Sequence, residues 1–188
     1  HDSGRVIICH DKSKLDKSWA IEEMRKSIKR DFYAVTREWP YKNVKPRIIA
    51  EELLESSRSN DSSASLCDND INDYKFFCFG GKVEFMKVDF DRSTNHHANY
   101  YDRSFNMLEF GEIECPPVKE RMIPKPSCFE EMIELAERIS RNHRFLRVDF
   151  YEVSGKVYFG ETTFYPASGT GKFSPEDADL TIGSLLKL

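Results

Sequence analysis

Two tight turns, each between a pair of strand-like segments, restrict the fold of this chain more than any other feature of its sequence. The turns are Gly80-Gly81 and Ser154-Gly155. The four segments that flank them are residues 74–79, 83–88, 145–153 and 156–164. Turn residues between two such segments predict a β-hairpin, and for the second hairpin we expect a loop of about three or four residues. Two hairpins in one chain indicate an antiparallel sheet.

Apolar residues at helical spacing predict two helices. The first covers residues 15–28, with charged residues between its apolar positions. The second runs from Ser127 to about Ser140 and begins with a capping box formed by Ser127 and Glu130. Its apolar face consists of Phe129, Met132, Ile133, Ala136 and Ile139.

The remaining segments are less regular. Residues 6–9 and 47–54 are apolar enough to be short strands, the second leading into a linker. Residues 56–70 are rich in Ser, Asn and Asp, which predicts an exposed loop. Residues 91–126 show no clear period, and a long irregular segment in a compact domain is usually functional or disordered.

Charge and cysteine content narrow the class of protein. A net charge of −4 without a basic cluster argues against nucleic-acid binding. No apolar run approaches the roughly 20 residues of a membrane helix. The five cysteines form no CxxC pair, so we expect reduced thiols in a cytoplasmic protein. The chain begins His-Asp-Ser-Gly-Arg without Met, which suggests an N-terminal truncation.

The second hairpin carries the residues best suited to chemistry. Because side chains alternate along a strand, Arg147, Asp149 and Tyr151 share one face, and Glu161 and Thr163 share a face of the next strand. We expect Asp149 to lie opposite Glu161, a pairing of like charges that is destabilising by itself. A magnesium ion would offset that cost. Two alternatives stay open: a solvated face with an Arg–Asp ion pair, or a register slipped by one residue, which would separate the acids.

This hairpin resembles the metal-binding hairpin of ATP-grasp enzymes, whose pattern is Arg-x-Asp, a turn, Glu-x-Asn and a Pro-Gly turn. Here the pattern reads Arg147-Val-Asp149, then Glu161-Thr-Thr163, then Pro166 to Gly169. More narrowly, the chain resembles the TupA-like ATP-grasp family, which is linked to teichuronopeptide and cell-surface polysaccharide synthesis. The other resembling segments, in family order, are residues 1–4, 11–16, 38–41, 46–54, 73–79 and 88–92.

The resemblance implies an α+β ATP-grasp fold of two lobes, with an antiparallel sheet in the large lobe. Residues 1–48 would be the remainder of the small lobe and residues 49–188 the large lobe. It implies an enzyme that uses ATP and Mg²⁺ to join a carboxylate to an amine through an acyl phosphate. The acceptor would be an amino acid, an amino sugar or a polymer.

The resemblance also assigns roles to single residues. The loop that closes over the ATP phosphates would include His1, Ser3 and Gly4. Glu51, Glu52 and Leu54 would be the linker that contacts adenine, although an ordinary strand end with exposed acids fits the same sequence. Asp73 would contact the ribose and Lys75 the phosphates, unless Lys75 is only a solvated residue on an edge strand. The metal ligands would be Asp149, Glu161 and Thr163, and the catalytic arginines would be Arg147 and Arg92.

Two departures from the family pattern stand out. Thr163 replaces the usual Asn ligand, and the lysine that relatives carry on the strand entering the small-lobe loop is absent from this chain. His96 and His97 suggest zinc, but adjacent residues on an extended segment point apart, and no Cys or acid has suitable spacing. Surface histidines, or substrate contact in an acceptor loop, are the alternatives.

Two other functions remain open. A metal-dependent glycosyltransferase would need a strand-terminal Asp-x-Asp, and Asp89-Phe-Asp91 has that spacing without a preceding βαβ pattern. A catalytically silent ATP-grasp module is the other, because Thr163 and the missing lysine both weaken the catalytic pattern.

Overall fold

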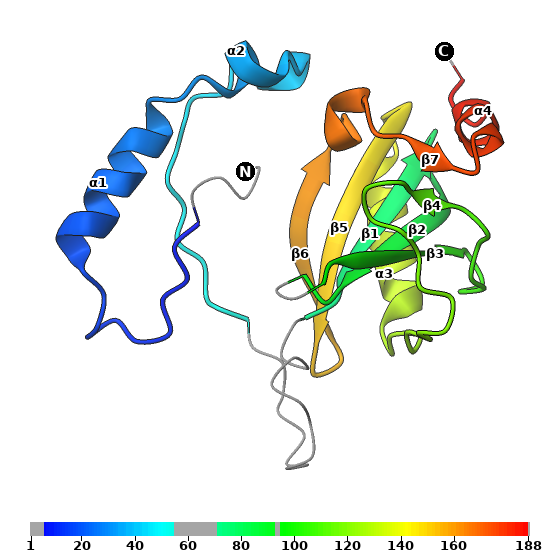
Figure 1. Cartoon of the computed structure of the whole chain (residues 1–188), viewed down its shortest axis with the longest axis horizontal. Coiled ribbons are helices and arrows are strands. Elements are labelled where there is room, and N and C mark those ends of the chain that lie inside the picture. Colours follow the sequence, from blue (N-terminus) through cyan, green and yellow to red (C-terminus); the bar gives the residue numbers. More distant parts are fainter. Residues whose placement is uncertain (1–5, 55–70, 93–94, 188) are drawn as a thin grey trace. The chain divides into compact units, whose positions relative to one another are not determined.

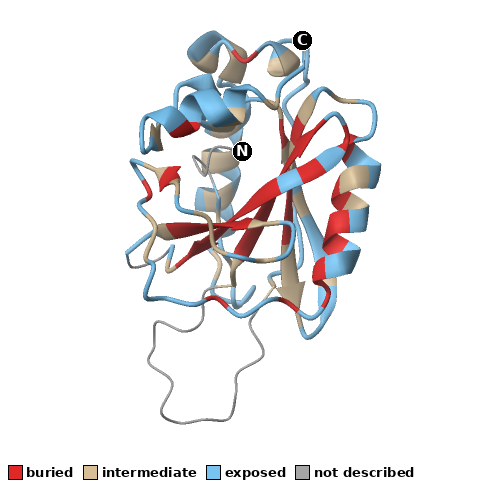
Figure 2. Ribbon diagram, turned by 90° about the vertical axis from the view of Figure 1, so that its right-hand side faces the viewer, coloured by how far each residue is buried: buried red, intermediate tan, exposed pale blue. Residues whose placement is uncertain are grey.

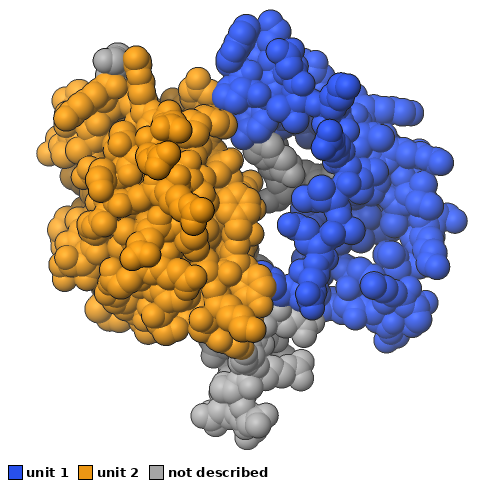
Figure 3. Space-filling view, turned by 180° about the vertical axis from the view of Figure 1, so that it is seen from behind, with its two compact units in different colours: residues 1–54 blue, residues 55–188 orange. Residues whose placement is uncertain are grey.

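The computed structural model describes residues 6–54, 71–92 and 95–187. The chain divides into two compact units, residues 1–54 and residues 55–188 (Figure 3). No helix among the described residues is both long enough and apolar enough to cross a membrane.

The described part of unit 1, residues 6–54, contains three short helices. They are α1 (Lys17–Ile28), α2 (Phe32–Thr36) and the 3₁₀ helix η1 (Trp39–Tyr41). Asp16 caps α1 by accepting a hydrogen bond from the Trp19 backbone N–H, and Asp31 caps α2 in the same way from Ala34. The helix predicted over residues 15–28 is therefore confirmed, whereas α2 was not predicted.

The strands predicted at residues 6–9 and 47–54 are wrong. Both segments have no regular secondary structure, and no described strand pairs with either of them. A strand is stable only when a neighbouring strand takes up its N–H and C=O groups. Apolar composition predicts strand character but not the presence of that neighbour.

Unit 2 is built on a five-stranded antiparallel sheet in the order β3-β2-β1-β5-β6 (Figure 1). The strands are β1 (Asp73–Phe79), β2 (Lys82–Phe90), β3 (His97–Asp102), β5 (Phe145–Val153) and β6 (Lys156–Thr163). Both predicted hairpins are confirmed, as β1–β2 and β5–β6. Neither β3 nor the short β4 (Gly111–Glu112) was predicted within residues 91–126.

The turn of the second hairpin is shorter than expected. Val153 pairs with Lys156, which leaves a two-residue turn of Ser154 and Gly155. Both turn residues have positive φ, 53° and 72°. This backbone matches the right-handed twist of the flanking strands, which is why two-residue hairpin turns favour it. The expected loop of three or four residues is wrong.

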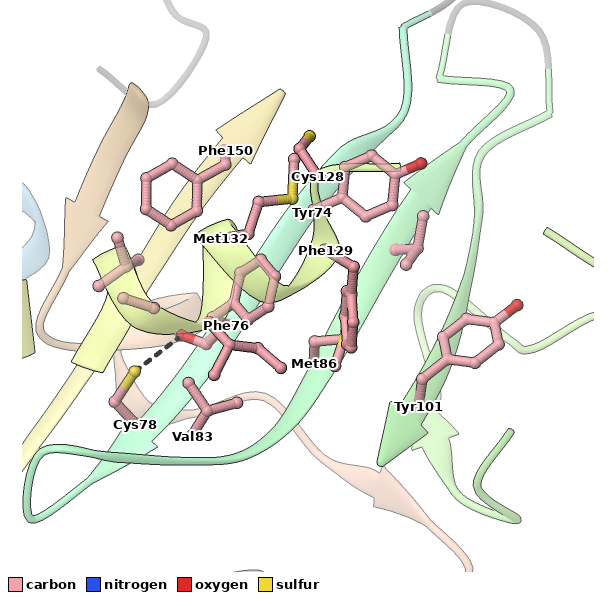
Figure 4. Close-up of a cluster of buried hydrophobic side chains, with 14 of the residues drawn as sticks. Tyr74, Phe76, Cys78, Val83, Met86, Tyr101, Cys128, Phe129, Met132 and Phe150 are labelled. Carbon is pink, nitrogen blue, oxygen red and sulfur yellow. Dashed lines mark hydrogen bonds between the residues drawn. The ribbon is translucent and has the colours of Figure 1, made fainter. Parts of the chain in front are cut away.

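One face of the sheet packs against α3 (Phe129–Ser140) (Figure 1). Figure 4 shows the resulting core, in which aromatic and sulfur-containing side chains from β1, β2 and β5 meet the helix. The predicted helix is confirmed, but its capping box is wrong. Cys128 is the N-cap residue and makes no side-chain capping bond. The Ser127 hydroxyl group instead donates a hydrogen bond to the Glu152 carboxylate.

The opposite face of the sheet has an apolar half and a charged half. The apolar half contains Phe77, Phe79, Phe85 and Tyr100. Phe173 of β7 (Phe173–Ser174) and Ile182 of α4 (Asp177–Gly183) pack against it. The charged half lies on the same strands, which are buried along most of their length in Figure 2. Charged residues are rarely so buried without a specific reason.

Candidate functional site

Lys75 lies at the centre of the charged half of the sheet. Its ammonium group is 2.5 Å from Asp73 Oδ2, 2.8 Å from Asp149 Oδ2 and 3.7 Å from Asp89 Oδ2. The residue is 7% exposed, because β1 is the central strand of five. The interpretation of Lys75 as a solvated residue on an edge strand is therefore wrong.

The charged groups around Lys75 shift one another's pKa values. Burial alone would lower the pKa of Lys75, but the carboxylates of Asp149 and Asp73 outweigh it and raise that pKa above its ordinary value. For Asp73 burial is the largest cause and Asp149 adds to it, so the pKa of Asp73 is raised despite the neighbouring lysine. Its Oδ1 is buried without a hydrogen-bond partner. One oxygen of Asp73 thus remains available to a ligand.

Arg147 connects Asp149 with Glu161. Its guanidinium donates two hydrogen bonds to Asp149, at 2.8 and 2.7 Å, and NH2 donates a third to Glu161 Oε1 at 3.1 Å. Burial opposes the charge on Arg147, but the attraction of Asp149 prevails and raises its pKa. The two carboxylates therefore lie on either side of one guanidinium nitrogen.

A β-bulge sets the geometry of the two acids. Arg147 pairs with Thr163, and Phe150 pairs with Phe159, so the register shifts between them. Gly160 and Glu161 together lie opposite Asp149. The expected one-to-one pairing of Asp149 with Glu161 is replaced by a pairing of two residues with one. Bulges redirect side chains in this way and are common beside active sites.

Thr163 completes this part of the site. It is 7% exposed, lies beside Arg147 across the strands, and its hydroxyl oxygen has no hydrogen-bond partner. A buried hydroxyl without a partner costs roughly 1–3 kcal/mol. With Asp149 and Glu161, this hydroxyl forms a set of oxygen donors of the kind that Mg²⁺ prefers.

Arg92 and Lys87 extend the charged cluster. Arg92 donates to Asp73 Oδ2 at 2.8 Å. Lys87 Nζ is 2.6 Å from Glu112 Oε2 and 3.3 Å from Asp89 Oδ1. Sequence reasoning missed Lys87, and it missed Asp89 as a member of this cluster. The signal was available in β2, whose alternation places both residues on the same face as Lys75.

The histidine pair separates as expected, since His97 contacts the Pro116 carbonyl and His96 contacts Asp89. The reason given against a metal at His96 does not hold, however. The fold brings Asp89 and Cys115 within reach of its ring. Spacing along the chain did not reveal this because the three residues come from different segments.

A glycosyltransferase site would need the two aspartates of Asp89-Phe-Asp91 to act together after a βαβ unit, and the described structure shows neither feature. Asp89 faces the lysines, whereas Asp91 pairs with Arg121 at 2.7 Å. Every strand pairing in the described part of the chain is antiparallel, so it contains no parallel βαβ unit.

The other predicted nucleotide contacts belong to unit 1 or fall outside the described residues. Glu51, Glu52 and Leu54 belong to unit 1, where residues 51–54 have no regular secondary structure. His1, Ser3 and Gly4 lie outside the described residues. The roles assigned to these six residues stay predictions.

A family model described as TupA-like ATPgrasp matches residues 1–187. No curated protein matches the chain, and no solved structure matches it.

Proposed function

This chain belongs to the TupA-like ATP-grasp family, and we propose that it is an ATP- and Mg²⁺-dependent ligase that joins a carboxylate to an amine. Its mixture of helices with an antiparallel sheet is consistent with that family. We further propose that the product belongs to the synthesis of a surface polysaccharide or teichuronopeptide.

The observation that carries this proposal is the buried cluster of Lys75, Asp73, Asp149 and Arg147. Burying ions carries a desolvation cost of several kcal/mol per ion, so such a network is weak evidence for a stabilising role. Side chains with strongly shifted pKa values are concentrated at functional sites. The raised pKa values of Lys75 and Arg147 keep both groups positively charged at neutral pH, as phosphate binding requires.

Asp149, Glu161 and Thr163 fit a magnesium ion. Two carboxylates are held close together by their contacts with Arg147, and the Thr163 hydroxyl is buried without a partner. When bound, Mg²⁺ would neutralise phosphate charge and orient the phosphate for in-line attack. The free hydroxyl supports Thr163 as a substitute for the usual Asn ligand.

ATP would contact several residues of this chain. Lys75 would bind a phosphate, and the unpartnered Oδ1 of Asp73 would accept a hydrogen bond from a ribose hydroxyl. We propose, from the family resemblance, that Glu51, Glu52 and Leu54 contact the adenine. From the same resemblance, the loop with His1, Ser3 and Gly4 would close over the phosphates and exclude water.

The reaction would proceed in two steps. The donor carboxylate attacks the γ-phosphate of ATP, which forms an acyl phosphate and releases ADP. The amine of an amino acid, amino sugar or polymer then attacks the acyl carbon and displaces phosphate. Arg147 and Arg92 would stabilise the negative charge that develops on oxygen in these steps.

Nucleotide binding tests the proposal against its rivals. We expect calorimetry to show ATP binding that requires Mg²⁺, and ADP to form only when a carboxylate substrate is added. Hydroxylamine should then trap the acyl phosphate as a hydroxamate. Binding of a nucleotide sugar instead of ATP would indicate a glycosyltransferase, and binding of neither would indicate a silent module.

A matched pair of variants ties the result to the site. Glu161→Gln should weaken Mg²⁺-dependent ATP binding, because it removes one carboxylate charge from the metal site. Glu84→Gln makes the same change at an exposed position of β2 and should leave binding unaltered. Equal effects of the two substitutions would contradict the proposed metal site.

A further inference from the structure

We propose that Asp89, His96 and Cys115 form a zinc-binding site, separate from the proposed magnesium site on β5 and β6. One candidate ligand atom of each residue lies within 4.8 Å of those of the other two. Asp89 belongs to β2, His96 directly precedes β3, and Cys115 follows β4. The proposed ligase reaction does not use this set of side chains.

The donor atoms favour zinc over magnesium. A thiolate sulfur, an imidazole nitrogen and a carboxylate oxygen are all zinc ligands, and three protein ligands leave a fourth position for water or a substrate atom. Magnesium prefers oxygen ligands throughout, as Asp149, Glu161 and Thr163 provide. The two sites therefore differ in the ion they select.

The three side chains already lie close to a ligating arrangement. His96 Nε2 is 2.9 Å from Asp89 Oδ1, and Cys115 Sγ is 3.7 Å from the His96 backbone oxygen. Zinc bonds to nitrogen and oxygen are about 2.0–2.2 Å and to sulfur about 2.3 Å. Ligand atoms around one zinc ion thus stand roughly 3–4 Å apart, so only small side-chain movements are needed.

Burial and charge are compatible with a bound ion. Asp89 and Cys115 are buried, while the His96 side chain is 40% exposed and marks the side from which a metal would enter. Lys87 contacts Asp89 but lies closer to Glu112, so it keeps a partner when Asp89 binds the metal. The other oxygen of Asp89 faces Lys75 at 3.7 Å. Asp89 would therefore connect the zinc site with the buried charges of the catalytic site.

Cobalt provides a direct probe, because Co²⁺ occupies zinc sites and a thiolate ligand gives it a charge-transfer absorption in the near ultraviolet. Titration of the purified, reduced chain with Co²⁺ should give this band with an end point of one equivalent. Zn²⁺ should then abolish it by displacement. Absence of the band, or binding without an end point, would overturn the proposal.

Four variants locate the site. Cys115→Ser should remove the charge-transfer band, and His96→Ala should weaken Co²⁺ binding by about tenfold or more. Cys9→Ser and His97→Ala make the same chemical changes outside the site and should leave the titration unaltered. A band that survives Cys115→Ser, or that responds equally to His97→Ala, would show that the metal binds elsewhere.

The wild-type chain offers a second test that needs no variant. One equivalent of Zn²⁺ should slow the alkylation of Cys115 by iodoacetamide, followed by mass spectrometry of its peptide. Alkylation of Cys9 should be unaffected. Because Cys115 is buried, the reaction is followed until the metal-free chain is measurably alkylated. Equal Cys115 rates with and without Zn²⁺ would then also overturn the proposal, whatever the outcome of the ATP experiments.

Discussion

Arg147 and Asp149, two residues apart on β5, are joined by two parallel hydrogen bonds. Arg147 Nε donates to Oδ1 at 2.8 Å, and NH2 donates to Oδ2 at 2.7 Å. This pairing uses the planar fork of the guanidinium, which the single ammonium group of a lysine cannot reproduce. The orientation of Arg147 beside the proposed metal site therefore depends on its being an arginine.

Replacing Arg147 by lysine should separate catalysis from binding. We expect Arg147→Lys to leave ATP affinity within a few fold, because the positive charge remains. Turnover should fall by roughly 10²–10³, the size of effect seen when one oxyanion donor is lost. ADP release with a cognate acceptor and nucleotide titration measure the two effects.

Arg144→Lys is the matched control, since Arg144 is exposed and directly precedes the same strand. It should change neither quantity. An equal loss of ATP affinity and turnover in Arg147→Lys would show instead that Arg147 only holds phosphate.

The unpartnered hydroxyl of Thr163 leads to a second prediction. Thr163→Val replaces a buried, unbonded hydroxyl with a methyl group of similar shape, so the free energy of unfolding should stay the same or rise by about 1 kcal/mol. Mg²⁺-dependent ATP binding should weaken by about tenfold or more, since even the loss of groups that support metal ligands has effects of that size. Thr162→Val, one residue earlier, should have no effect on binding. A loss of stability with unchanged binding would show that the hydroxyl serves the fold.

The raised pKa of Asp73 predicts how stability changes with pH. A carboxyl whose pKa is higher in the folded state stabilises the fold fully below its unfolded pKa, and this contribution is lost as pH rises through the folded value. Asp73→Asn is neutral at every pH. The stability of the variant relative to wild type should therefore increase as the pH rises from the unfolded pKa of an aspartate, about 3.9, through the higher folded value.

Urea denaturation at a series of pH values measures the difference in the free energy of unfolding between Asp73→Asn and the wild type. Asp102→Asn is a control of opposite sign. Desolvation is the largest single influence on the pKa of Asp102 and raises it, but the hydrogen bonds from Asn106 and Ser104 together hold that pKa below its usual value. That variant should lose stability relative to wild type as pH rises through the carboxyl range. A flat difference for Asp73→Asn would contradict the raised pKa.

The sequence predicted the parts of the fold that depend on neighbours along the chain. Two pairs of turn residues were enough to identify β1–β2 and β5–β6, because a tight turn forces the flanking segments together. Alternation then placed Arg147 and Asp149 on one face correctly. The helix at residues 129–140 followed from its apolar spacing.

What the sequence did not predict depends on contacts between distant segments. The burial of Lys75 follows from the position of β1 in the middle of the sheet, and local patterns do not give strand order. The bulge at Gly160 and Glu161 interrupts the strand alternation from which the register was predicted. Asp89, His96 and Cys115 meet only after the chain has folded, so no spacing rule could find them.

The first hairpin turn allows a comparison of two adjacent glycines. Both have positive φ, 57° at Gly80 and 80° at Gly81, but only Gly81 is crowded. A Cβ there would lie 2.9 Å from the Arg141 Cα, whereas a Cβ at Gly80 would meet no atom within 4 Å. Gly80→Ala should lower the free energy of unfolding by roughly 1–2 kcal/mol, the cost of the left-handed conformation. Gly81→Ala should cost clearly more, and equal losses in chemical denaturation would contradict this difference.

Lys75 should be the most sensitive position of the charged cluster. Lys75→Met would leave Asp73 and Asp149 buried without the ammonium group that both now contact, at 2.5 and 2.8 Å. Breaking a buried ion pair by removing one partner costs about 3–5 kcal/mol, so the free energy of unfolding should fall by that amount. Lys82→Met, at an exposed position of β2, should change stability by no more than about 0.5 kcal/mol.

A double variant tests whether the uncompensated charge is the cause of that loss. Asp73→Asn removes one of the carboxylates left behind, so it should recover part of the stability lost in Lys75→Met. In a double-mutant cycle, residues that contact each other in one ion-pair network give interaction energies of roughly 0.5–3 kcal/mol. Urea denaturation of the wild type, both single variants and the double variant measures this term. Strictly additive losses would mean that Lys75 stabilises the sheet through the packing of its methylene chain, because only a charge-based role makes the two substitutions depend on each other.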